Sequence, residues 1–550
     1  MKKYYMTSDI IKKIPGAIFA YWLSDNFLNV FSKATPMIEI ANCCTGMQTG
    51  NNDKYVKMWH EINYTNTQLY SKNGDWYKYN CGGDARKWYG NHLNLVFWKN
   101  NGQAIRNEKS SVVRNEKFFF KKGITWKRIK TSTFSLRYLP EGFIFDQAGD
   151  SMFLKENNSL NYILGLVNST VVTKILECIS PSLNLTAGNM NKVPVVFQDR
   201  DKIIIDTLVD ENIKTSRKDW DSFENSWDFS KHPLMEEKIM SKLLSEKFSS
   251  WESECKDRFQ KVKDNEETLN KMFIDIYGLN GEIDYEVSDD DITIRLADKE
   301  REIKSLISYL VGIEMGRYSL DVEGLAYAGG EWNPMNYVTY QPDDDGIIPI
   351  YTQLGMADGL TARIIKLIKH IYGEDTYREN IEFIAEALGK NQNESAEETL
   401  NRYLNYGFYA DHLKTYQKRP IYWMFSSGKN DAFKCLVYLH RYNEDTLAKI
   451  NSKYFLNESA RLNVEVNETR TLLEAADGRE KLRLDKQMKL LNARQKEMIE
   501  YGQVLDHMAN QYINLDLDDG VKVNYAKFQG IEIVNDSGAK VKKDLLVPIK

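Results

Sequence analysis

The residues best suited to chemistry on a polyanion are concentrated in residues 78–137. This segment carries 14 Lys and Arg but only 3 Asp and Glu, within a chain of 550 residues whose formal net charge is -5. Lys and Arg neutralise phosphates, whereas Arg, Asn and Gln also read base edges in the major groove. A basic block inside an acidic chain favours a local surface for nucleic acid, although charge alone would fit a solvated face equally well.

The basic candidates are densest around Gly123, which we interpret as a turn between two strands. For each phosphate that they contact, the DNA affinity should fall by roughly one log unit when the salt concentration rises by one log unit. The polar candidates near residues 49–52 and 184–189 fit a DNA-facing loop and a turn or helix cap equally well. The side chains predicted to contact DNA are Thr49, Asn51, Asn52, Lys78, Arg86, Lys87, Lys121, Lys122, Lys127, Arg128, Lys130, Arg137, Asn184 and Asn189.

Motifs for cofactor chemistry are absent from the sequence. None of the 32 glycines lie two residues apart, which excludes the G-x-G dinucleotide fingerprint, and no G-x-x-x-x-G pair is followed by Lys, which excludes a Walker A motif. None of the 11 prolines are adjacent, whereas amino-methylating DNA enzymes hold the flipped base with a proline pair beside an aromatic residue. The closest approach, residues 333–337, is interpreted as a loop. We therefore assign no catalytic or cofactor-binding residue.

Metal chemistry is also weakly supported. A site built from Cys43, Cys44, Cys81 and His92 is conceivable, but their spacing matches no zinc motif and incidental or buried thiols are favoured. The aspartate runs at 289–291 and 343–345 would suit magnesium in a nuclease, and they fit solvated turns better. No metal site is assigned.

The elements that must position these residues are of two kinds, which predicts an α+β fold. Residues 1–200 form a mixed α/β domain, with strands at 93–98, 118–120, 134–138 and 143–145 and a helix at 160–179. The remainder is mainly helical, including helices at 298–312, 359–370 and 377–388. The predicted segments are a DNA target-recognition domain (1–200), a helical connector (201–330), a mainly helical domain (331–455), a helical hairpin (456–512) and a C-terminal tail (513–550).

Heptad spacing predicts the hairpin. Apolar residues recur at alternating intervals of four and three in residues 462–476 and again in residues 484–509, with Asp477-Gly478 as the turn. Gln495 and Gly502 interrupt this seam. Six scattered cysteines, no signal peptide and no long apolar stretch favour a cytoplasmic protein without a membrane partner.

Several short motifs together resemble the target-recognition domain of adenine methyltransferases in restriction-like systems. They occur in order at residues 46–53, 78–90, 137–140, 145–146, 164–169, 181–184, 188–190 and 193–194. Further segments at 14–22, 59–61, 273–279, 312–320 and 518–525 resemble the C-terminal half of the PglX family. PglX proteins are the adenine-specific DNA methyltransferases of BREX (bacteriophage exclusion) phage-defence systems.

The resemblance implies a DNA sequence-recognition portion that directs a separate catalytic domain or subunit to a specific site on double-stranded DNA. The family's S-adenosylmethionine-binding domain has no matching residues here, so this cofactor is expected in that separate part, and partners from other BREX proteins are implied. Two alternatives remain open. The chain could act as an enzyme, as a methyltransferase or a magnesium nuclease, or it could be a protein-interaction scaffold in which the hairpin docks a partner.

Overall fold

The computed structural model describes residues 23–129, 134–155, 159–180, 184–236, 240–534 and 538–549, and the chain divides into two compact units. Unit 1 comprises residues 1–59, 66–228 and 251–297, and unit 2 comprises residues 60–65, 229–250 and 298–550. Helices combined with several small sheets confirm the predicted α+β class. The units cut across the predicted boundaries at residues 200 and 330, because residues 201–228 and 251–297 pack into the core of unit 1.

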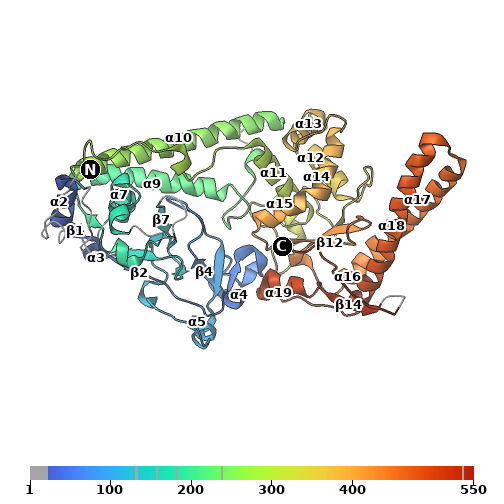
Figure 1. Ribbon diagram of the computed structural model, residues 1–550, viewed down its shortest axis with the longest axis horizontal. Coiled ribbons are helices and arrows are strands. Elements are labelled where there is room, and N and C mark those ends of the chain that lie inside the picture. The colour runs from blue at the N-terminus through green and yellow to red at the C-terminus, as the bar shows by residue number, and fades with distance from the viewer. Residues whose placement is uncertain are drawn as a thin grey trace, which may run out of the picture. The chain divides into compact units, whose positions relative to one another are not determined.

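Two four-stranded sheets form the β part of unit 1 (Figure 1). The first has the order β2 (Ala41–Cys44), β9 (Ser151–Leu154), β6 (Gly123–Trp126) and β7 (Leu136–Leu139), and all its neighbours are antiparallel. The second has the order β3 (Val56–Met58), β5 (Asn94–Phe97), β4 (Trp76–Asn80) and β8 (Phe143–Phe145), in which β4 and β8 are parallel. A short pair joins β1 (Thr35–Pro36) to β10 (Pro194–Val195).

The predicted helix at 160–179 is two helices, α6 (Leu160–Val167) and α7 (Thr170–Ile179), which meet at an angle of 65°. The break has a local cause. The Ser169 hydroxyl accepts a hydrogen bond from the backbone of Val172 and so starts a new helix, while the Asn168 amide bonds both backbone polar groups of Leu136. No single helix in the described part of the chain is long and apolar enough to cross a membrane, and this bent pair meets that criterion only when its two helices are taken together.

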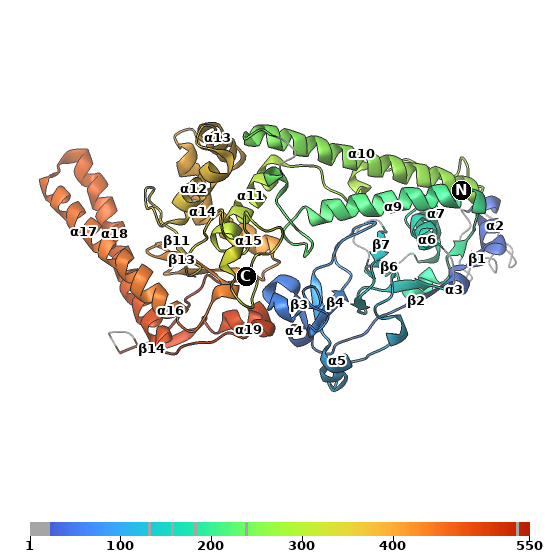
Figure 2. The ribbon, with the colours of Figure 1, turned by 180° about the vertical axis from the view of Figure 1, so that it is seen from behind.

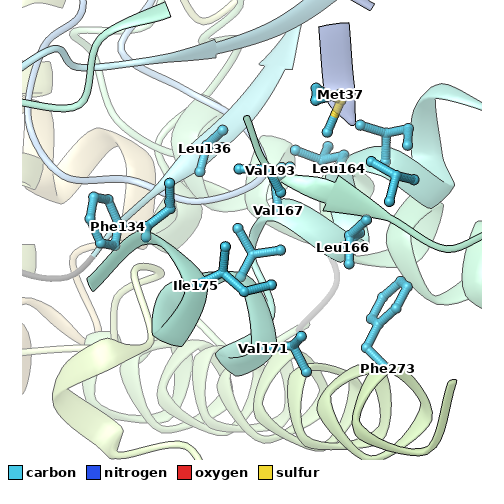
Figure 3. Close-up of a cluster of buried hydrophobic side chains, with 14 of the residues drawn as sticks. Met37, Phe134, Leu136, Leu164, Leu166, Val167, Val171, Ile175, Val193 and Phe273 are labelled. Atoms are coloured by element: carbon cyan, nitrogen blue, oxygen red, sulfur yellow. The ribbon is translucent and has the colours of Figure 1, made fainter. Parts of the chain in front are cut away.

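The main core of unit 1 lies around α6 and α7 (Figure 3). Leu136, Val167, Ile175 and Val193 are fully buried and point into one cluster. Phe273 of α10 (Leu244–Ile276) joins the same cluster from the other side. This packing anchors β7 and the long helices to one another.

α9 (Asp199–Asp221) runs beside α10 in both ribbon views (Figures 1 and 2). The Asn265 amide donates to the Asn212 side chain at 2.9 Å, and Ile205 and Val209 of α9 are fully buried. The shorter helices of unit 1 are α2 (Asp25–Lys33), α3 (Met37–Ile40), α4 (Asn52–Tyr55), α5 (Lys99–Arg106) and α8 (Ala187–Met190).

Unit 2 combines helices with a small antiparallel sheet of order β11 (Ile347–Pro349), β13 (Lys434–Tyr438) and β12 (Tyr422–Ser426). The sequence predicts a mainly helical domain for residues 331–455. The strands β12 and β13 were missed because both are buried apolar runs without alternation. The other elements are α11 (Lys299–Glu314), α12 (Leu360–Tyr372), α13 (Tyr377–Ala387), α14 (Ala396–Tyr406), α15 (Phe408–Thr415), α16 (Thr446–Lys449), α19 (Gly520–Ala526), β14 (Ile531–Val534) and β15 (Lys540–Lys543).

The predicted hairpin is confirmed as α17 (Leu456–Ala475) and α18 (Gly478–Ala509). Its seam buries Leu462 and Val466 of α17 in one cluster with Leu491 of α18, and Leu484 of α18 is buried nearer the turn. Gly502 does not weaken the packing, because the ring of Phe455 occupies the space that a Cβ at Gly502 would need.

Candidate nucleic-acid interface

Five loop segments of unit 1 lie side by side along one edge of the β2–β9–β6–β7 sheet, and we call them the rim: residues 45–53, 107–117, 127–129, 146–150 and 184–189. The ladder geometry places them there, because Cys44 and Ser151 pair where β2 ends and β9 begins, and β6 ends one residue beyond its pair with Ser151. Segments far apart in sequence therefore meet at one place.

Backbone hydrogen bonds join the rim segments in series. Gln48 and Val112 exchange two bonds of 2.9 and 2.8 Å, and the Met47 N–H donates to the carbonyl of Phe145 at 3.0 Å. The Arg128 N–H donates to Ala148 at 3.1 Å, and the Arg128 carbonyl accepts from Leu185 at 2.8 Å. The rim is consequently a continuous backbone surface, on which side chains hold fixed relative positions.

Cations, amides and two carboxylates are the exposed polar chemistry of the rim, and the exposed carboxylates are those of Asp53 and Glu116. Lys109 and Lys117 are exposed, and Arg114, Lys127 and Arg128 are half-buried. The carboxylates of the 107–117 segment are Glu108 and Glu116, and Glu116 is held by Arg106 at 2.6 Å. The exposed side-chain amides are those of Asn51, Asn52, Asn107, Gln147 and Asn184. Sequence reasoning missed Gln147, and it counted Lys109, Arg114 and Lys117 only as part of the basic block.

Seven of the predicted DNA contacts belong to the rim, and all of them except the buried Thr49 are at least partly exposed. Lys127 and Arg128 directly follow β6, and Asn51, Asn52, Asn184 and Asn189 stand on the neighbouring loops. At least three of these amides, including Asn52, also make hydrogen bonds within the chain. The Asn51 side chain accepts from the Lys54 N–H and caps α4, and the Asn189 amide donates to the Ser180 hydroxyl at 2.7 Å.

Arg86 and Lys87 are buried, so their prediction as DNA contacts does not fit the structure. The Arg86 guanidinium lies 2.5 Å from the Asp219 carboxylate of α9, and the Lys87 ammonium lies 2.6 Å from Glu266 of α10. Glu266 also accepts a hydrogen bond of 2.7 Å from the indole of Trp88. The two ion pairs tie the loop after β4 to both long helices, because a buried charge requires a partner.

Arg137 and Thr49 are buried too, and each contacts its own chain. The Arg137 side chain is completely inaccessible and donates to the carbonyl of Gly82 and to the Asn80 side chain. Burial and, to a lesser extent, nearby Arg86 together lower the pKa of Arg137 to about 10. The Thr49 hydroxyl donates to Asn52 across the turn. Neither side chain is available to DNA in this conformation.

The predicted cluster around Gly123 is divided by the structure. Gly123 is not a turn but the first residue of β6, where a Cβ would collide with the carbonyl of Met152. Lys121 and Lys122 are exposed at the start of this strand, whereas Lys127 and Arg128 follow its end on the rim. Lys78 is half-buried on β4, with its ammonium 5.9 Å from the Phe143 ring, and Lys130 lies outside the described residues.

Two buried carboxylates of the rim hold its backbone in place by accepting hydrogen bonds. Asp146 accepts hydrogen bonds of 2.8 Å from the N–H groups of Ala148 and Gly149, which form the turn before β9. Asp150 accepts from the Ala187 N–H at 3.0 Å and so connects this turn to α8. Burial raises the pKa of Asp150, although Arg128 and Arg114 nearby act in the opposite direction.

Asp146 should make the stability of unit 1 depend on pH. Burial raises its pKa from 3.8 to about 6, so the folded state binds more protons than the unfolded state between these values. The contribution of Asp146 to stability therefore falls as the pH rises through this window. We expect the Tm of Asp146→Asn to fall less than that of the wild type between about pH 4 and pH 7.

The measurement is differential scanning fluorimetry of both proteins across this range. Asp84→Asn, at an exposed position of the same unit, is the matched control and should follow the wild type. Parallel curves for all three proteins would show that Asp146 does not titrate in this window.

Metal ligands are not grouped in the part of the chain that the structure describes. Burial raises the pKa of the Cys44 thiol to about 12 and also raises that of Cys43, so both thiols stay protonated. The run 343–345 is not a solvated turn as predicted: Asp343 is buried, accepts from Gly346 and Ile347, and lies 2.7 Å from Arg363. Asp289 of the other run is exposed and pairs with Lys263.

Two curated proteins are similar to the chain over nearly its whole length. It is 39% identical over 546 residues to the adenine-specific methyltransferase PglX of Lacticaseibacillus casei (strain Zhang). It is 36% identical over 549 residues to the adenine-specific methyltransferase BrxX of Escherichia coli O9:H4 (strain HS). Both relatives are adenine-specific methyltransferases by name. No protein-family profile matches the chain.

Each match covers 94% of this chain but 45% of the relative, so the chain spans about half the length of the curated relatives it matches. The predicted resemblance to PglX proteins is confirmed by these similarities. That this chain corresponds to the C-terminal half of PglX proteins stays a prediction.

Proposed function

We propose that unit 1 carries the sequence-recognition surface of a BREX-type adenine-specific DNA methyltransferase, and that the rim is the part that contacts DNA. The observation that carries the proposal is the meeting of five loops at one sheet edge with exposed cations and amides. Similarity to two adenine-specific methyltransferases over 94% of the chain supports it. Among the other described candidate cations, Arg86 and Lys87 are buried in ion pairs and Arg137 is buried against Gly82. Lys78 is half-buried on β4, and Lys121 and Lys122 lie at the other end of β6, so the rim is the surface that combines exposed cations with base-reading side chains.

On this proposal the side chains of the rim divide their work by chemistry. Lys109, Lys117 and Lys127 contact phosphates and fix the register on the duplex, without reading sequence. Arg128 and Gln147 are suited to bidentate bonds with guanine and adenine, respectively, in the major groove. Because the rim is cross-linked by backbone bonds, recognition requires little ordering of loops on binding.

Methyl transfer is assigned to sequence outside these 550 residues. The chain contains neither a G-x-G motif nor a proline pair, so we propose that S-adenosylmethionine and the flipped adenine are held by a separate catalytic domain or subunit. Binding of unit 1 would bring the target adenine to that partner, and other BREX proteins are candidate partners of the same complex.

The structure places the cations around Gly123 at the two ends of β6, and comparing these two pairs gives a direct test of the proposal. Lys127→Ala/Arg128→Ala removes two rim cations, and Lys121→Ala/Lys122→Ala removes equal charge at the other end of β6. We expect the first variant to bind a cognate duplex at least tenfold more weakly, since a good base contact contributes about 1–3 kcal/mol. The second variant should stay within a few-fold of the wild type. Fluorescence anisotropy with cognate and scrambled duplexes measures both.

The site of methylation provides the second readout. Each variant is co-expressed with the S-adenosylmethionine-binding domain of the same system, and methylated adenines are located by sequencing. Loss of site-specific methylation is expected with the rim variant only. Unchanged affinity and methylation in the rim variant, or equal losses in both variants, would contradict recognition by the rim.

A further inference from the structure

The hairpin of unit 2 presents a second basic surface. In both ribbon views α17 and α18 lie side by side and extend away from the β11–β13–β12 sheet of the same unit (Figures 1 and 2). Their facing sides are occupied by the buried seam, and the Gln495 amide bonds Asn463 at 2.7 Å across it. Residues 479–496 of α18 contain seven cations but only two acidic residues, Glu480 and Asp485.

Four of these cations share the face of α18 that points away from the seam. Arg479, Lys486, Lys489 and Lys496 are spaced by seven, three and seven residues, which keeps them within about a third of the helix circumference. All four are exposed, and none takes part in an ion pair among the described residues. Arg483 and Arg494, by contrast, bond Glu480 and the carbonyl of Asn430. We call Arg479, Lys486, Lys489 and Lys496 the basic face. Lys481 is exposed as well, but it lies outside this third of the circumference.

We propose that the basic face is a sequence-independent contact for the backbone of duplex DNA. Its four charges extend over about 26 Å of helix, and a duplex presents one negative charge per about 1.7 Å of its axis, so several phosphates lie within reach. Unpaired cations on one face of a long helix suit this partner, because phosphate contacts need charge but no pocket. The inference rests on the proposed action of the chain on DNA, but not on base reading by the rim.

A protein partner is less well matched to this surface. The apolar side chains exposed on α18 are Leu482, Leu490 and Ile499, which are eight and nine residues apart and form no continuous patch. Stable protein interfaces have an apolar core from which charged residues are depleted. The basic face, by contrast, consists of charged side chains without an apolar core.

The test replaces all four cations by alanine in the full chain and measures binding to a duplex that lacks any cognate site. The slope of log affinity against log salt should become shallower by about 3.6 if all four contact phosphates. Between 50 and 200 mM salt, the wild-type affinity should then fall on the order of 100-fold more than that of the variant. Replacing the three lysines by arginine should preserve the wild-type slope, and Asn492→Ala is a neutral control on the same helix.

The outcomes separate this inference from the function of the rim. A shallower slope with unchanged preference for the cognate sequence supports the basic face. An unchanged slope in the four-alanine variant overturns it, whatever the rim variants do. Loss of binding to an acidic protein of the system, with no change in binding to DNA, would also overturn it and would identify a protein as the partner. Loss of sequence preference in the Lys127→Ala/Arg128→Ala variant alone concerns only the rim.

Discussion

Replacing Glu266 by alanine is expected to destabilise unit 1 by about 3–5 kcal/mol, which is a large share of the stability of a typical domain. The substitution leaves the ammonium of Lys87, whose side chain is 8% exposed, and the indole N–H of Trp88 without their acceptor. Trp88 also adopts a left-handed backbone conformation (φ 68°) that its contacts must hold in place. Unfolding followed by tryptophan fluorescence measures the loss.

Asp257→Ala is the matched control for Glu266, because it removes a carboxylate from an exposed position of the same helix. It should change stability by less than about 0.5 kcal/mol. Adding Lys87→Met to Glu266→Ala should recover part of the loss, since the stranded charge is then removed. If the single and double variants were equally unstable, the effect would come from packing and not from the ion pair.

Substituting Gly46 by alanine is expected to disrupt the rim and to abolish specific DNA binding. A Cβ at this position would lie far inside van der Waals contact with the backbone of Phe145. That backbone cannot retreat easily, because β8 is paired with β4 and the Phe145 carbonyl accepts the Met47 N–H. We expect a cost of about 3 kcal/mol or more, at or above the upper end for overpacked cores, and displacement of residues 45–53.

Gly188→Ala is the control within the rim. Its nearest neighbour, the Thr186 hydroxyl oxygen, would lie 3.6 Å from the new Cβ, so the substitution should be tolerated. Thermal unfolding and anisotropy with a cognate duplex distinguish the two variants. Wild-type affinity in Gly46→Ala would show that the contact between residues 46 and 145 does not position the loop that we propose to contact DNA.

Some helices and strands could be predicted from the sequence because their patterns of apolar and polar residues lie within a short stretch of the chain. The strand at β5 and the helices α11, α12 and α13 were predicted close to their observed bounds, and so was the α17–α18 hairpin. Heptad spacing is a property of consecutive residues, so the seam can be recognised without knowing its surroundings. The basic block was equally visible, because net charge over 60 residues does not depend on folding.

The sequence by itself determined the α+β class, the hairpin, the concentration of cations in unit 1 and the absence of cofactor motifs. Only the tertiary structure decided which cations face solvent. Arg86, Lys87 and Arg137 resemble Lys127 and Arg128 in sequence, yet the first three are buried against Asp219, Glu266 and Gly82. Burial and pairing depend on partners up to 179 residues away, and a charge pattern along the chain carries no information about such partners.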